Sequence, residues 1–223
     1  MSDDISLRLK NIEAASQELA RNIASLRAHF ELSAGAAQRA ARKYELTDER
    51  RNLAGHTLRR IRAVRDIPEQ GVRAGDRGGF VESERNLSHT GTAWVSGEAR
   101  VFGEAQVAGA ARVSGRARVS DRARVSGKAR VSGKARVSGA AWVEGEALVS
   151  GEAWVADEAQ VSGRAWVFGK AWVFGRAWVF GEAEVSGEAR VAGKALVAGK
   201  ERVSGDARRG LPSPTRSPNA PGL

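Results

Sequence analysis

The chain has 223 residues, of which 42% are hydrophobic and 28% charged, and its formal net charge is +10. It contains no cysteine, which excludes disulfides, thiolate zinc sites and cysteine nucleophiles. Three histidines and one tyrosine leave few carriers for acid–base or metal chemistry. The positive charge permits an anionic partner without requiring one. The abundance of Ala, Val and Gly favours a chain that is built by repetition.

Composition divides the chain into four segments. We expect an amphipathic helix over residues 1–42, a compact cap over 43–92, a repeat over 93–206 and a disordered tail rich in Pro and Arg over 207–223. The N-terminus has neither a basic start nor an apolar run, and no stretch approaches the roughly 18 apolar residues of a spanning helix. The sequence therefore predicts no membrane association and a cytoplasmic or virion-associated protein.

Apolar residues of the first segment follow the 4–3 spacing that is typical of a coiled coil. The predicted seam, which Ser16 interrupts, consists of Ile5, Leu9, Ile12, Leu19, Ile23, Leu26 and Phe30. This spacing predicts self-association through the helix. The alternative is an amphipathic helix that folds onto its own chain.

Nineteen consecutive six-residue units run from Ala93 to Asp206 and follow the pattern Ala-x-Val-x-Gly-x, with Glu in the Ala position of the last unit. Ala and Val alternate with polar or bulky residues, which is the period-two pattern of a strand with one buried face. Gly, replaced by Asp at 121 and 157, supplies a backbone corner. The unit resembles the hexapeptide repeat of left-handed parallel β-helices, in which three hexads make one coil of 18 residues. We therefore expect a mainly β fold: a single-stranded left-handed parallel β-helix of about six coils after an N-terminal α-helical segment.

Charges after the corners support this coil. Residues 18 apart are mostly opposite in sign, as in the series Lys128, Glu146, Arg164, Glu182 and Lys200. Coils stacked about 4.8 Å apart would make such residues neighbours on one face. Each opposite pair would then contribute roughly 0.2–1 kcal/mol.

A second pattern precedes the repeat. It consists of Lys43-Tyr44-Glu45-Leu46-Thr47-Asp48-Glu49, Leu58-Arg59-Arg60-Ile61-Arg62-Ala63, Ala74-Gly75-Asp76-Arg77-Gly78-Gly79-Phe80-Val81-Glu82 and Asn86-Leu87-Ser88. It resembles the entry segment of YdcK-like hexapeptide-repeat proteins, which occur in bacteria and prophages and are often called polymer-forming. The resemblance implies a left-handed β-helix related in shape to the trimeric hexapeptide acyltransferases, and it implies no established activity. At the other end the pattern fails at Arg209, where Val should stand.

Acyl transfer is the enzymatic alternative for such a repeat. Enzymes of this type resemble one another in a catalytic histidine that projects from a coil, where a general base must meet the substrate. The histidines here are His29, His56 and His89, and none follows residue 90. A zinc site of three histidines from adjacent coils is absent for the same reason. We therefore expect no enzyme, cofactor or metal and place His89 in the cap, while a transferase without the usual histidine stays as the alternative.

Basic residues are dense in the first half of the repeat. The outward arginines that could contact an anion are Arg112, Arg118, Arg124, Arg130 and Arg136. Consecutive hexads lie on successive sides, so these arginines should encircle the prism instead of lining one face. This geometry argues against nucleic-acid binding, which stays as a second alternative together with other anionic ligands.

Aromatic residues mark one coil, 165–182. All six tryptophans of the chain occupy the outward slot between Ala and Val, and this coil carries Trp166, Phe168, Trp172, Phe174, Trp178 and Phe180. Exposed aromatic area of this density favours an interface with a second copy, another protein or a glycan. The alternative is stacking along the prism, with Trp154 beside Trp172 and Arg190 over Trp172. The predicted function is a non-enzymatic structural or interaction module, a rigid spacer or binding surface associated with phage or prophage.

Overall fold

The computed structural model describes residues 16–27, 29–30 and 42–210. They belong to two units, which divide between Arg42 and Lys43. In the first unit a helix covers residues 16–27, and 29–30 are also helical. The seam residues Leu19, Ile23, Leu26 and Phe30 are exposed on this helix, whereas Ile5, Leu9 and Ile12 lie outside the described residues. No helix of the described ranges is long and apolar enough to cross a membrane.

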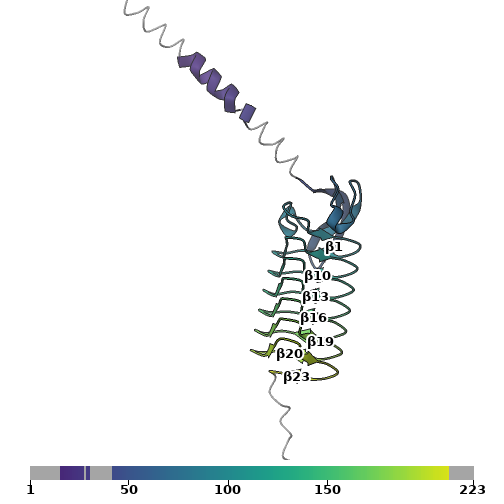
Figure 1. Cartoon of the computed structure of the whole chain (residues 1–223). Coiled ribbons are helices and arrows are strands. Elements are labelled where there is room, and N and C mark those ends of the chain that lie inside the picture. Colours follow the sequence, from purple (N-terminus) through teal and green to yellow (C-terminus); the bar gives the residue numbers. More distant parts are fainter. Residues whose placement is uncertain (1–15, 28, 31–41, 211–223) are drawn as a thin grey trace, which may run out of the picture. The chain divides into compact units, whose positions relative to one another are not determined.

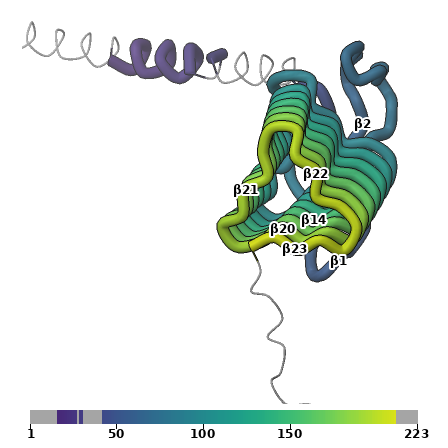
Figure 2. The backbone as a smooth tube through the Cα atoms, turned by 60° about the horizontal axis from the view of Figure 1, so that its bottom comes forward, coloured from purple at the N-terminus to yellow at the C-terminus, as the bar shows by residue number. Residues whose placement is uncertain are grey.

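The second unit is a parallel β-solenoid with three sides (Figures 1 and 2). Each hexad contributes a two-residue strand, and each strand pairs with the strand 18 residues further on, as Val131 does with Val149. Side 1 consists of β4 (Trp94–Val95), β7 (Arg112–Val113), β10 (Arg130–Val131), β13 (Leu148–Val149), β16 (Trp166–Val167), β19 (Glu184–Val185) and β22 (Arg202–Val203). The predicted mainly β solenoid of 18-residue coils is therefore confirmed, while its hand stays a prediction.

The other two sides are built in the same way. Side 2 consists of β5 (Arg100–Val101), β8 (Arg118–Val119), β11 (Arg136–Val137), β14 (Trp154–Val155), β17 (Trp172–Val173), β20 (Arg190–Val191) and β23 (Arg208–Arg209). Side 3 consists of β6 (Gln106–Val107), β9 (Arg124–Val125), β12 (Trp142–Val143), β15 (Gln160–Val161), β18 (Trp178–Val179) and β21 (Leu196–Val197). Figure 2 shows the three sides as the edges of a triangle marked by β22, β20 and β21.

The interior consists of ladders of Ala and Val, one of each per side in every regular coil, and nearly all of them are fully buried. Burial of one Val side chain stabilises the fold by roughly 1.5–3 kcal/mol. One coil alone buries too little to be stable, so each coil depends on its neighbours.

Glycine is required at the corners because successive coils approach closely there. A Cβ atom on Gly127, whose φ is +65°, would lie 2.8 Å from the backbone N and O of Gly145. Asp121 and Asp157 adopt the same left-handed conformation, with φ of 61° and 60°. The carboxylate of each Asp accepts a hydrogen bond of 3.0 Å from the backbone N–H of the corner residue one coil further on. These corner residues are Gly139 for Asp121 and Gly175 for Asp157. This hydrogen bond explains why Asp, which tolerates the left-handed region better than most residues, replaces Gly.

The cap before the repeat consists of β1 (Tyr44–Leu53), β2 (His56–Ala63), η1 (Pro68–Gln70), β3 (Arg77–Val81) and η2 (Glu84–Asn86). Strands β1, β2 and β3 pair in antiparallel order, and β3 then pairs in parallel with β5. The solenoid therefore begins in the cap.

The predicted number of coils is corrected from about six to about seven. Phe80 and Val81 of β3 pair with Arg100 and Val101 before the hexads of side 2 begin. At the other end β23 pairs with β20 after the last regular hexad and reaches into the segment predicted as a tail. Counting hexads could not include either strand, because neither carries the complete repeat.

Side chains close the first coil. In regular coils the carbonyls of Ala and Gly accept backbone N–H groups from the coil before, as Ala111 does from Trp94. At the entry, Lys43 Nζ donates to the Ala93 carbonyl at 2.6 Å, and Asn86 Nδ2 donates to the carbonyls of Gly103 and Ala105 at 2.9 Å. These bonds satisfy buried acceptors that would otherwise lack a partner.

The opposite end is closed by two charges at inward positions. Glu201 stands where the repeat has Ala, and Arg209 stands where it has Val. Their side chains form an ion pair, and Arg209 also donates to the Leu196 carbonyl at 3.3 Å. The repeat therefore ends in a polar lid instead of an open apolar core.

Candidate functional site

The predicted aromatic residues lie on all three sides of one coil. Trp166 on side 1, Trp172 on side 2 and Trp178 on side 3 are 53%, 39% and 49% exposed. We call the aromatic belt the six residues Trp166, Phe168, Trp172, Phe174, Trp178 and Phe180. Phe180 is also exposed, and the two other phenylalanines are half-buried. Trp94 differs from the other outward tryptophans because it is buried with the cap.

On side 2 the rings stack along the solenoid as the alternative interpretation predicted. The ring centroids of Trp154 and Trp172 are 5.2 Å apart in an edge-to-face arrangement. Arg136 lies over Trp154 at 6.0 Å, and Arg190 lies over Trp172 at 4.9 Å. Trp154 also donates from Nε1 to Ser138 Oγ at 3.0 Å. The side-2 tryptophans are therefore held in place by their own column.

On sides 1 and 3 the belt has different neighbours. Trp166 pairs in register with Leu148 and Glu184, and Trp178 pairs with Gln160 and Leu196. Within the described part of the chain, neither of these two tryptophans stacks on a ring or lies under a cation. Stacking along the solenoid is therefore confirmed for the side-2 tryptophans, and an interface at the belt stays a prediction.

Two hollows flank the tryptophan pair of side 2. One, of about 170 Å³, is lined by Trp154, Ala156, Asp157, Trp172 and Phe174. The other, of about 410 Å³, is lined by Lys134, Arg136, Glu152, Trp154, Lys170 and Trp172. The first is mainly apolar and the second is mainly charged. Both are open to solvent, and neither is an enclosed chamber.

The five predicted basic residues are distributed around the prism, as expected. Arg112 and Arg130 lie on side 1, Arg118 and Arg136 on side 2, and Arg124 on side 3. Arg112 donates from Nε to Gln70 Oε1 of the cap at 2.7 Å, and Arg124 lies over Trp142 at 5.4 Å. Because Arg136 lies over Trp154, three of these five arginines have contacts within the chain.

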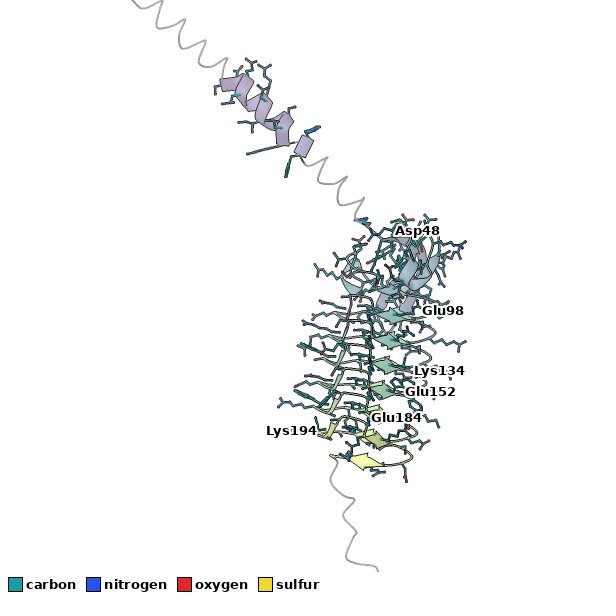
Figure 3. All side chains as sticks on the ribbon, viewed as in Figure 1. Asp48, Glu98, Lys134, Glu152, Glu184 and Lys194 are labelled. Carbon is teal, nitrogen blue, oxygen red and sulfur yellow. The ribbon has the colours of Figure 1, made fainter. Side chains whose placement is uncertain are left out.

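The predicted ladder of ion pairs is confirmed. Its successive N–O distances run 3.2, 3.4, 3.6 and 4.0 Å along the series Lys128, Glu146, Arg164, Glu182 and Lys200. A hydrogen bond from Lys128 lowers the pKa of Glu146. Lys134 and Glu152 form a similar pair at 2.7 Å, one coil above the other (Figure 3). Exposed pairs of this kind stabilise only weakly, but they fix the positions of charges next to the tryptophans.

The histidines lie outside the hexads. His56 Nδ1 is 3.0 Å from Glu82 Oε1, and this hydrogen bond lowers the pKa of Glu82. His89 stacks on Tyr44 in the cap, as predicted, and His29 lies in the helix. Within residues 16–27, 29–30 and 42–210, no three His, Cys, Asp or Glu side chains gather closely enough to hold a metal ion.

Comparison with known families agrees with this architecture. Residues 111–127, 117–133 and 129–145 match the model of the YdcK β-solenoid repeat. Residues 111–145 are thus similar to the YdcK repeat, and the β-solenoid around them is consistent with that repeat. The matched stretches include the five basic residues described above, whereas the aromatic belt lies beyond them. Comparison with curated proteins returned no match.

Proposed function

We propose that this chain is a non-enzymatic interaction module whose β-solenoid presents the aromatic belt to a partner. The observation that carries the proposal is the exposure of apolar rings on three sides of a single coil. Soluble proteins rarely expose dense apolar area unless it binds something. The partner is a second copy, another protein or a glycan, and a cytoplasmic or virion-associated location belongs to the same proposal.

The construction of the coil supports a role in binding. Backbone hydrogen bonds join each coil to the next at nearly constant distances, for example 2.9 Å from Trp166 N to the Ala183 carbonyl. Side chains on such a backbone lose little further freedom on binding, which lowers the entropic cost of association. The interior is filled by Ala and Val, so recognition falls to the outward residues.

The triple substitution of Trp166, Trp172 and Trp178 by Thr tests this function. Thr favours strands, so the coils should stay folded by circular dichroism and thermal melting. We expect the variant to lose the self-association that light scattering detects in the parent, or its binding to a glycan array. Trp142→Thr, which changes the same slot in another coil, should keep both. Unchanged mass together with unchanged glycan binding would contradict the proposal, as would a parent that neither associates nor binds.

The transferase alternative makes a different prediction. A protein that binds coenzyme A thioesters would melt at a higher temperature in their presence, because a ligand that binds the folded state stabilises it. The proposed module should show no such shift with acetyl-coenzyme A, and a clear shift would favour the transferase instead.

A further inference from the structure

Stacking of coils on side 2 brings outward side chains that are 18 residues apart in the sequence into one column. Parallel pairing places residues 18 apart directly above one another. We call the side-2 strip the column of Arg100, Arg118, Arg136, Trp154, Trp172 and Arg190. The strip contains no acidic residue, so three cations in succession lead to a pair of tryptophans and a further cation.

The upper arginines of the strip lack anionic partners. Across the described part of the solenoid, no carboxylate lies within ion-pair distance of Arg100, Arg118 or Arg136. Arg100 Nε is buried without a hydrogen-bond partner there. Burial, followed by the charges of Arg118 and Arg51, lowers the pKa of Arg100. Like charges opposite each other on adjacent strands destabilise a sheet, and a bound anion would relieve this repulsion.

The corner beside the strip balances its own charges, because Lys134 pairs with Glu152 at 2.7 Å and Lys170 pairs with Glu188 at 3.4 Å. The charged hollow next to the tryptophans has three cationic side chains, Lys134, Arg136 and Lys170, and one carboxylate, Glu152. The apolar hollow on the other flank includes Asp157. The surface therefore offers three kinds of group to a ligand. Its cations can bind acidic groups of the ligand, its tryptophan rings can pack against an apolar face of a ligand ring, and its carboxylates can accept hydrogen bonds from ligand hydroxyl groups.

We propose that the side-2 strip binds a linear acidic polysaccharide that runs along the stack of coils. Its acidic groups contact Arg100, Arg118 and Arg136, and its sugar rings lie against Trp154 and Trp172. The carboxylates of Glu152 and Asp157 favour this ligand over a nucleic acid. A nucleic acid has a phosphate on every nucleotide, and these carboxylates would repel it. A saccharide can instead present hydroxyl groups, which donate hydrogen bonds to the carboxylates. The inference deepens the proposed function, because Trp172 also belongs to the aromatic belt.

Binding of oligogalacturonate to the full chain tests the proposal, with dextran as the neutral comparison. We expect binding that weakens as salt increases, because released counterions drive such association, and no binding of dextran. The double variant R118Q/R136Q should weaken binding about tenfold or more, since it removes two charge-assisted contacts. The matched control R124Q/R130Q removes the same charge from sides 3 and 1 and should retain the parent affinity. Trp172→Thr should also weaken binding, and Trp142→Thr should not.

Three outcomes would overturn the proposal. The first is no binding of oligogalacturonate at low salt, and the second is an equal loss in the two double variants, which would indicate net charge alone. The third is that single-stranded oligo(dT) binds more tightly than oligogalacturonate and depends in the same way on Arg118 and Arg136, which would indicate a nucleic-acid site. R118Q/R136Q leaves the aromatic belt intact, so it tests the polysaccharide site alone. The proposed function is tested separately, by the light-scattering mass of the variant in which Thr replaces Trp166, Trp172 and Trp178.

Discussion

Lys43 is fully buried in the cap, and its ammonium group donates to the Ala93 carbonyl. Burial, followed by the nearby charge of Arg65, lowers the pKa of Lys43 to about 8 from its usual 10.5. A buried lysine is an uncommon choice for this role, and its long side chain reaches a carbonyl that belongs to the first regular hexad. One residue therefore joins the beginning of the cap to the beginning of the repeat.

We predict that Lys43 makes stability depend on alkaline pH. Between pH 8 and 10.5 the folded state holds fewer protons on Lys43 than the unfolded state does. The free energy of unfolding of the parent should therefore rise, relative to that of Lys43→Met, as pH increases through this window. Urea unfolding of both proteins from about pH 7 to pH 10 measures the difference. A difference that stays constant with pH would show that Lys43 keeps its usual pKa.

Single residues also show what the sequence could not predict. The replacement of Gly by Asp at 121 and 157 is visible in the sequence, and so is their corner position. Their hydrogen bonds to Gly139 and Gly175 depend on the left-handed φ and on the distance between coils, so only the structure reveals them. Arg100 was likewise absent from the predicted basic residues, and the structure shows that it pairs in register with Arg118, which in turn pairs with Arg136.

At the scale of elements, the last coil differs from the rest by its inward ion pair, Glu201 with Arg209. Inward charges at a sheet end prevent strands from adding to the exposed edge. Glu201 already departs from the hexad pattern in the sequence, because it occupies an Ala position. Its role becomes clear once Arg209 is seen to lie within reach of it.

The double variant Glu201→Ala and Arg209→Val would restore the repeat at both inward positions. We predict concentration-dependent self-association of this variant through the newly apolar end, detectable by sedimentation velocity. The control Glu184→Gln with Arg202→Gln removes an outward ion pair of 3.3 Å and should sediment like the parent. Equal sedimentation of all three proteins would contradict a protective role for the inward pair.

The cap illustrates the limit of periodicity as a predictor. Its extent followed from the loss of the hexad pattern and from the family resemblance, but its antiparallel strands did not. The contacts that close the first coil join distant residues, as from Lys43 to Ala93 and from Asn86 to Gly103. Such contacts have no repeating pattern, whereas the Ala and Val ladders of the coils repeat every six residues and were therefore predictable.

At the scale of the whole molecule, the N-terminal helix is the second element proposed to mediate association. We predict that full-length L19D/L26D has a lower mass in light scattering than the parent, because charges in a coiled-coil seam oppose pairing. The control Q17D/A24D places the same charges seven residues apart at positions away from the seam. If the parent and both variants have the mass of one chain, the helix does not pair, and the alternative of a helix folded onto its own chain would be favoured.

The three-sided coil has a consequence for how the length of this protein can change. A duplication of 18 residues would lengthen the solenoid by one rise of about 4.8 Å and leave every column intact. A duplication of six or twelve residues would turn all later side chains onto a neighbouring side. Between Trp154 and Trp172, for example, it would place these two residues on different sides and interrupt the ladder that begins at Lys128. Insertions and deletions inside the solenoid should therefore be tolerated when they add or remove whole coils, that is, multiples of three hexads.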